Sequence, residues 1–213
     1  MAGWRNHTGL AVALPMEGID TDQLIPARFM STPRAEGYGR FLLHDLRIDR
    51  EGKPRADHPL NRHPEASILL AGRNFGGGSS REAAVYALVD FGIKAVIAPS
   101  FGDIFAGNAV NNGLLSARIS DADHAKLSNA LDSGVGTLTI DLETCQITLG
   151  DLTRPFALDP VWRTKLIEGW DDIVLTAKHA HAIAAFTQKD RATRPWAYLN
   201  TEFSPPNQNP TGA

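Results

Sequence analysis

The chain has 213 residues, of which 43% are hydrophobic, and a formal net charge of −3. This length and apolar content favour a single compact domain, and the weak acidic charge argues against nucleic acid or an anionic membrane as a partner. A single cysteine, Cys145, excludes an internal disulfide and cannot by itself hold an iron–sulfur cluster. No apolar run is long enough for a membrane span or a secretory core, so we expect a cytoplasmic protein.

The first half of the chain predicts strands that alternate with one helix. Residues 7–15 and 66–72 form apolar runs typical of strands, the second one buried on both faces. Residues 80–90 carry apolar side chains at helical spacing, and Gly92 stands where a left-handed helix end is expected. Residues 94–100 predict the next strand. Strand, glycine-rich turn, helix and strand together have the length of a right-handed crossover, which implies a parallel strand pair.

The second half predicts the rest of an α/β fold layered around a mixed sheet. In chain order we expect a helix, a strand, a helix, two β segments and two helices over 103–113, 114–120, 121–134, 137–150, 161–169 and 177–189. Asp121 is expected to cap the helix that it begins. The charged residues 46–64 are expected to form a loop. Residues 204–213 contain too few apolar side chains to pack, so the prediction is one domain over 1–203 and a disordered tail.

The sequence GGGSSRE at 76–82 has two explanations. Ser79 and Glu82 have the spacing of a capping box at a helix start. That explanation leaves three glycines and Arg81 unaccounted for, whereas glycines beside a helix N-terminus and an arginine favour a site for carboxylate or phosphate. The P-loop, dinucleotide and nucleophile-elbow motifs are not met, because none of them has this residue order. Both explanations stay open on the pattern alone.

Three stretches in order carry a resemblance to one family. They are IDTDQLIPARF (19–29), NFGGGSSRE (74–82) and IAPSF (97–101), and the similarity continues through 156–186. The chain resembles the small subunits of 3-isopropylmalate dehydratase, the isopropylmalate isomerase of leucine biosynthesis. The resemblance implies an aconitase-type swivelling domain of the α/β class, with three β/β/α layers around a mixed sheet. It also implies a large partner subunit that carries a [4Fe-4S] cluster, while this chain binds no cofactor or metal.

The resemblance also implies which residues act. The reaction in the family is dehydration of 2-isopropylmalate to an unsaturated diacid and rehydration to 3-isopropylmalate, and the first serine of SSRE, here Ser79, removes the proton from carbon. Arg81 matches the arginine that binds a substrate carboxylate, with Ser80 beside it as a hydrogen-bond donor. Asp22 matches an acidic residue of the active-site face, although Asp-Thr-Asp is also a common helix start. Arg28 is a further candidate to bind the small dicarboxylate.

Two positions depart from the family pattern NFGCGSSREHA. Gly77 stands in place of the cysteine, and Ala83 in place of the histidine. These departures leave open a divergent paralogue that acts on another small 2-hydroxy diacid, of the methylmalate or dimethylmalate type. They also leave open a non-catalytic partner subunit that kept the fold. A free-standing anion-binding module that uses the glycine-rich turn alone is the third alternative.

Overall fold

A computed structural model describes residues 2–131 and 134–198. Its contacts divide the chain into two compact units, Met1–Ile173 and Val174–Ala213, and each is described by itself. The single domain expected over 1–203 stays a prediction, and the tail 204–213 lies outside the described residues. Among the described helices, none is long and apolar enough to cross a membrane.

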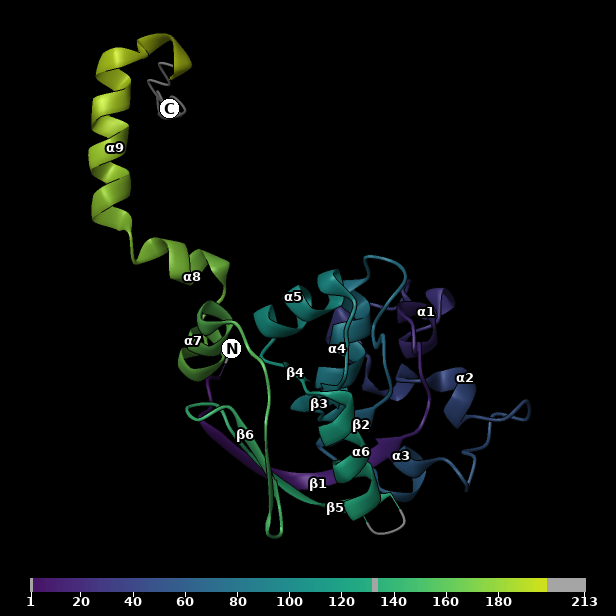
Figure 1. The fold of residues 1–213 in the computed structure, drawn as a ribbon. Coiled ribbons are helices and arrows are strands. Elements are labelled where there is room, and N and C mark those ends of the chain that lie inside the picture. Colours follow the sequence, from purple (N-terminus) through teal and green to yellow (C-terminus); the bar gives the residue numbers. More distant parts are fainter. Residues whose placement is uncertain (1, 132–133, 199–213) are drawn as a thin grey trace, which may run out of the picture. The chain divides into compact units, whose positions relative to one another are not determined.

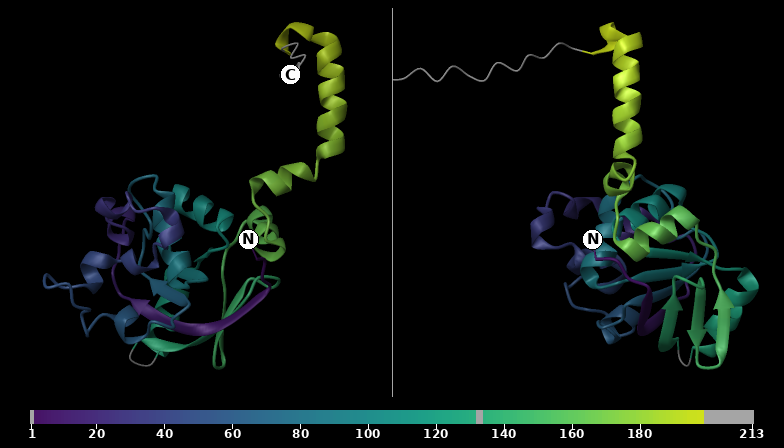
Figure 2. Two further views of the ribbon diagram at one scale, coloured as in Figure 1. Left: turned by 180° about the vertical axis from the view of Figure 1, so that it is seen from behind. Right: turned by 90° about the vertical axis from the view of Figure 1, so that its left-hand side faces the viewer.

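The first unit is built on one seven-stranded mixed sheet (Figure 1). Its strands are β1 (Asn6–Leu14), β2 (Ile68–Ala71), β3 (Ala95–Ala98), β4 (Leu115–Arg118), β5 (Val135–Asp141), β6 (Gln146–Leu149) and β7 (Leu152–Pro155). They lie in the order β4-β3-β2-β1-β5-β6-β7. Strands β1 to β4 pair in parallel, which confirms the predicted parallel pair. Strands β5 to β7 pair antiparallel and appear as green arrows side by side in the right-hand view of Figure 2.

The described α-helices are α1 (Thr21–Leu24), α2 (His44–Arg47), α3 (Pro59–Arg62), α4 (Glu82–Phe91), α5 (Asp103–Asn111), α6 (Asp121–Ala130), α7 (Pro160–Glu168), α8 (Asp172–Ala177) and α9 (Ala180–Thr193). They include the five predicted ones, with different ends, and four short ones that were not predicted, α1, α2, α3 and α8. Gly92 ends α4 with φ of 108°, as predicted. The predicted cap of α6 was wrong, because Ser120 rather than Asp121 accepts a hydrogen bond, from the Asp123 amide at 3.1 Å. The predicted loop 46–64 contains α3.

Two apolar clusters lie on opposite faces of the parallel strands. One joins Leu69 of β2 to Leu88 of α4 and Phe105 of α5. The other joins Leu70 of β2 to Leu138 of β5. Because residues from both halves of the sheet share the second cluster, the sheet curls so that its halves face each other. The layers are therefore β, β and α, which confirms the predicted aconitase-type arrangement.

The second unit contains α9, which confirms the predicted helix over 177–189. Near its C-terminal end, Asp190 accepts hydrogen bonds from the Tyr198 hydroxyl and from Nε of Arg194, each at 2.7 Å. Ile183 and Phe186 on this helix are exposed. These contacts fix the last described turn onto the helix end.

Candidate active site

The predicted site residues gather where the parallel strands end. The segment after β1 carries Asp22, the segment after β2 carries Ser79 to Arg81, and a third segment follows β3. In parallel sheets, ligands bind outside the carboxyl ends of the strands, since loops from neighbouring strands meet there. Figure 1 shows α1 and the start of α4 on this side of the sheet.

Backbone hydrogen bonds join the first two of these segments. The Thr21 amide donates to the Gly77 carbonyl at 3.0 Å, and the Gly76 amide donates to the Ile19 carbonyl at 2.7 Å. The Thr21 hydroxyl donates to the Ser79 carbonyl at 3.0 Å. The two family motifs, far apart in sequence, therefore form one surface.

Asp20 and Asp22 have different roles in that surface. Asp20 caps α1, because its Oδ1 accepts from the Gln23 amide at 2.7 Å while the Asp20 amide donates to Oε1 of Gln23 at 2.9 Å. Asp22 lies in the first turn of α1 and forms an ion pair with Nη1 of Arg81. The helix-start interpretation of Asp-Thr-Asp therefore holds for Asp20, and Asp22 belongs to the candidate site.

The glycines at 76–78 have structural reasons of their own. Gly76 has φ of 71°, and a Cβ there would lie 2.2 Å from Cγ of Phe105. Gly78 has φ of 92°, so both are in the left-handed region that favours glycine. Gly77 is outside that region, but the Asn74 side chain lies 3.0 Å from where its Cβ would be. The turn therefore needs glycine for its own shape and packing, and the glycines by themselves do not indicate a ligand.

The segment Ser79 to Arg81 opens onto solvent in front of α4. Ser79 and Ser80 are exposed, and the Ser79 hydroxyl has no hydrogen-bond partner within the described residues. The capping-box explanation was wrong: α4 begins at Glu82 with Arg81 as its N-cap and no side-chain cap. The Glu82 carboxylate accepts from Nδ2 of Asn112 at 2.9 Å instead. The Ala84 amide already donates to the Arg81 carbonyl at 3.1 Å, so of the first-turn N–H groups those of Glu82 and Ala83 are left for an anion.

Arg81 is more enclosed than its ion-pair partner Asp22. Its side chain is 21% exposed, against 56% for Asp22. The contact with Asp22 uses Nη1 of Arg81, which leaves the rest of its planar set of donors for a second carboxylate. The structure therefore brings together Asp22, Ser79, Ser80 and Arg81, and their roles in the reaction stay a prediction.

Arg28 lies in a different environment. Its Nη1 donates to Oδ2 of Asp45 at 3.0 Å, and its guanidinium lies 4.5 Å from the centre of the Phe29 ring. The hydrogen bond from Arg28 lowers the pKa of Asp45 to about 2. Within the described residues, no contact joins Arg28 to Ser79 or Arg81. Its role in substrate binding stays a prediction.

The two departures from the family pattern lie in different surroundings. The Asn74 side chain fills the space beside Gly77, so a cysteine there would require Asn74 to move. Ala83 is 8% exposed and packs in the apolar cluster under α4. A histidine at 83 would therefore place a polar ring at the edge of the core rather than in solvent.

Within residues 2–131 and 134–198, no group of three or more histidine, cysteine, aspartate or glutamate side chains could hold a metal ion. Cys145 is partly buried, and its thiol donates to the Leu142 carbonyl at 3.6 Å.

Comparison with known proteins decides the family. Residues 1–122 match the model of the aconitase C-terminal domain. A 3-isopropylmalate dehydratase small subunit of Rhodospirillum centenum is 44% identical over 194 residues, which span 89% of this chain and 96% of the relative. The chain belongs to the family of 3-isopropylmalate dehydratase small subunits. Another small subunit of this family, from a Shewanella species (strain ANA-3), is 46% identical over 87% of this chain and 96% of the relative.

A solved structure agrees with this family assignment. The crystal structure of a 3-isopropylmalate dehydratase from Methanocaldococcus jannaschii matches with a TM-score of 0.62 and 27% identity. The match covers 84% of this chain and 98% of that protein. The sequence motifs and the fold therefore indicate the same family.

Some features of the site were not predicted from the sequence. These are the contacts of Thr21 with Gly77 and Ser79, and the Phe105 ring under Gly76. One signal could have found the first set. Two polar motifs that each follow a parallel strand must lie at the same edge of the sheet.

Proposed function

We propose that this chain is the small subunit of a hydro-lyase that isomerises 2-isopropylmalate to 3-isopropylmalate in leucine biosynthesis. The observation that carries the proposal is the joined surface of Asp22, Ser79, Ser80 and Arg81 in a chain of this family. Such a role in biosynthesis also favours the cytoplasmic location expected from the sequence.

The proposal includes a large partner subunit with a [4Fe-4S] cluster. Such clusters need about four ligands, usually thiolates, and this chain has one cysteine in 213 residues. The chain's own donor set therefore does not fit the cluster, which we assign to the partner. When bound there, the cluster would act as a Lewis acid toward the substrate hydroxyl.

Ser79 supplies the proton transfer in this proposal. Its hydroxyl oxygen takes the proton from carbon, hydroxide leaves the neighbouring carbon, and a carbon–carbon double bond forms; rehydration returns both groups with their positions exchanged. A serine acts as a base only if its alkoxide is stabilised, at about 1.4 kcal/mol for each unit of pKa. The uncapped first turn of α4 and the guanidinium of Arg81 both carry positive charge next to Ser79 in sequence, so both would stabilise its alkoxide.

Arg81, Ser80 and Asp22 hold the substrate in this proposal. Arg81 binds a substrate carboxylate through the donors that Asp22 does not use. Ser80, exposed beside it, donates a further hydrogen bond. Asp22 carries the same charge as the substrate, so its contact with Arg81 makes it a positioning residue rather than a carboxylate ligand. The dicarboxylate is thus oriented by one fixed guanidinium.

A second substrate is favoured by a specific observation. Gly77 lacks the family's cysteine side chain two residues before Ser79, and Ala83 lacks the family's polar ring at the edge of the core under α4. With these departures, a smaller 2-hydroxy diacid of the methylmalate or dimethylmalate type is the alternative.

The test is turnover by the full chain mixed anaerobically with its large subunit. We expect interconversion of 2-isopropylmalate and 3-isopropylmalate, with 2-methylmalate and 2,3-dimethylmalate assayed in parallel. Turnover of only the smaller acids would replace the leucine-pathway substrate by the alternative. Turnover by the large subunit alone at the same rate would overturn the shared site.

A further inference from the structure

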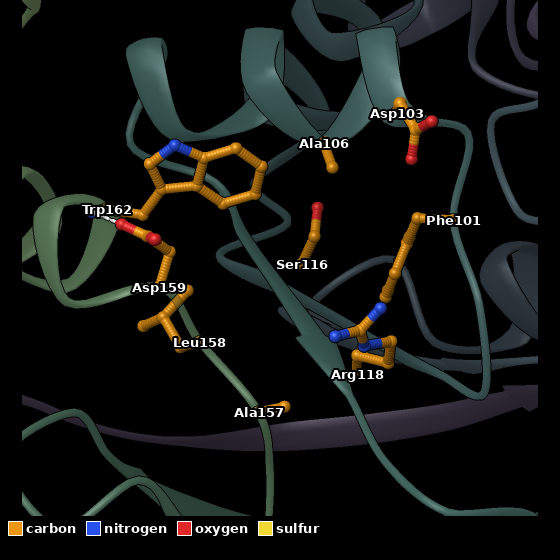
Figure 3. A pocket seen from close by; sticks show the side chains of 9 residues that line it. All are labelled: Phe101, Asp103, Ala106, Ser116, Arg118, Ala157, Leu158, Asp159 and Trp162. Carbon is orange, nitrogen blue, oxygen red and sulfur yellow. Dashed lines mark hydrogen bonds between the residues drawn. The ribbon is translucent and has the colours of Figure 1, made fainter.

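A pocket of about 700 Å³, whose lining includes neither Ser79 nor Arg81, lies on the edge strand β4 (Figure 3). Its walls come from the residues around the start of α5, from two side chains of β4, and from the segment 157–162 that leads into α7. The Ala157 amide donates to the Arg118 carbonyl at 2.7 Å, which fastens this segment to the strand. The volume lies within the range of small-molecule sites in proteins.

The two β4 side chains interrupt an apolar row. On the face that packs against α4 and α5, Val12 lies beside Leu69, Leu69 beside Val96, and Val96 beside Ser116. Arg118 follows two residues later and therefore points to the same face. Three strands place apolar side chains there, and the edge strand places a hydroxyl and a guanidinium. This change occurs at the pocket.

Ser116 is buried without a partner. The residue is 5% exposed, and its hydroxyl oxygen has no hydrogen bond to any of the described residues. Figure 3 shows this hydroxyl pointing toward Ala106, into the space between Trp162 and Asp103. A buried polar group left unsatisfied is destabilising, so such groups normally have a partner. A ligand in the pocket would supply one.

Arg118 is also without a partner in the described part of the chain. It is exposed, and no ion pair or side-chain hydrogen bond involves its guanidinium. Figure 3 shows the guanidinium among the pocket side chains rather than turned away from them. A planar guanidinium beside a hydroxyl is well suited to a carboxylate.

The other walls select against a plain anion. Asp103, on the first turn of α5, has no ion pair within the described residues. Asp159 uses its Oδ1 to cap α7, accepting from the Val161 amide at 2.8 Å. Two carboxylates and one guanidinium repel a dianion and attract a group of each sign. Leu158 and Trp162 add an apolar wall.

We propose that this pocket binds an α-amino acid with an apolar side chain. Its carboxylate pairs with the Arg118 guanidinium and accepts from the Ser116 hydroxyl. Its ammonium group faces Asp103, and its side chain packs against Trp162 and Leu158. Its lining contains none of Asp22, Ser79, Ser80 and Arg81, so it uses residues that the proposed reaction does not need.

The test uses the full chain and three probes that differ by one group. L-leucine carries both charges, 4-methylpentanoate lacks the ammonium group, and 3-methylbutylamine lacks the carboxylate. Titration calorimetry is expected to show binding of L-leucine and at least about tenfold weaker binding of each analogue. The loss of one hydrogen bond to a charged group weakens binding by about this factor. Equal binding of 4-methylpentanoate or of inorganic phosphate would overturn the zwitterion assignment, and no binding of L-leucine would overturn the site.

Variants separate this pocket from nonspecific binding. Arg118→Gln keeps a side chain of similar length and is expected to weaken the binding of L-leucine by roughly 10- to 100-fold. The matched control is Arg50→Gln, an exposed arginine in the segment before α3, which is expected to leave L-leucine binding unchanged. Full affinity in Arg118→Gln, or an equal loss in both variants, would contradict the proposed contacts.

Discussion

Two Ser-x-Arg triplets in this fold differ in the burial of the serine and in the pairing of the arginine. In the turn before α4, Ser79 is exposed and Arg81 is paired with Asp22. On β4, Ser116 is buried without a partner, and Arg118 is exposed with no ion pair in the described residues. The same residue types at the same spacing therefore acquire different chemistry from their backbone. An irregular turn exposes the serine to solvent, whereas a strand points both side chains at one face.

The largest effect is expected from the serine of the first triplet. Ser79→Ala removes the proposed base, so turnover with the large subunit should fall by roughly 10²- to 10⁴-fold. Ser128→Ala on α6 is the control, because this serine lies away from both triplets in sequence. The measurement is kcat of the anaerobic complex. Retention of more than about a tenth of kcat in Ser79→Ala would exclude serine as the base.

The turn that exposes Ser79 can be broken at Gly76. A side chain there combines a positive φ with a Cβ 2.2 Å from Phe105, so Gly76→Ala should lower the free energy of unfolding by about 2–4 kcal/mol. Gly92→Ala provides the comparison, since it has φ of 108° and no atom within 4 Å. Urea unfolding of both gives the contribution of the Phe105 clash as a difference. Equal losses would mean that only φ matters.

The arginine of the first triplet can be released by changing its partner. Asp22→Asn removes the charge that orients Arg81, so KM should rise by roughly tenfold while kcat changes less. The Tm should change little, because an ion pair with a 56% exposed carboxylate contributes little to stability. Asp22→Glu keeps the charge, so its KM should lie closer to that of the unchanged chain. A lower KM in Asp22→Asn would instead show that Asp22 competes with the substrate.

The serine of the second triplet should respond in the opposite direction. Ser116→Ala removes a buried hydroxyl without a partner, so the free energy of unfolding should rise by about 1 kcal/mol. The reciprocal change Ala117→Ser adds a hydroxyl on the other, fully buried face of β4 and should lower it. Both are measured by urea unfolding of the free chain. A loss of stability in Ser116→Ala would mean that its hydroxyl is satisfied in solution.

Replacement of a third arginine, Arg28, is expected to have the smallest effect on stability, and that effect should depend on pH. Hydrogen bonding from Arg28 lowers the pKa of Asp45 to about 2 from an ordinary value of 3.8. A lowered carboxyl pKa stabilises the fold above about pH 4, and that contribution disappears as the pH falls toward 2. Arg28→Gln should therefore lower Tm by no more than about 2 °C at pH 6, and less at pH 3. A difference that grows on acidification would contradict the pairing.

The sequence predicted the elements whose pattern is local. Continuous apolar runs predicted β2 and β3, and the motifs after β1 and β2 carried the family resemblance that made Asp22, Ser79 and Arg81 candidate site residues. The pairing of Asp22 with Arg81 joins positions 59 residues apart, and no local pattern encodes it. Helix α1 is too short to show a period. The apparent capping box failed because its helix begins two residues later than predicted, so spacing alone did not fix the N-terminus.

The pocket on β4 was not predicted from the sequence, for a related reason. Its lining comes from three segments, and LLSARIS was identified as a strand without regard to which face Ser116 and Arg118 would share. The register that places Ser116 beside Val96 is a property of the whole sheet. Only the assembled strands show that two polar side chains stand where neighbouring strands are apolar.

The position of β1 has a consequence for the order of biosynthesis. This strand leaves the ribosome first, yet it lies in the middle of the sheet, with Val12 between Leu69 and Val135. Until β5 is translated, one edge of β1 has unpaired N–H and C=O groups beside apolar side chains, which is a surface that favours aggregation. Nascent chains stalled before Val135 are therefore expected to depend on chaperones, and completion of β5 closes that edge.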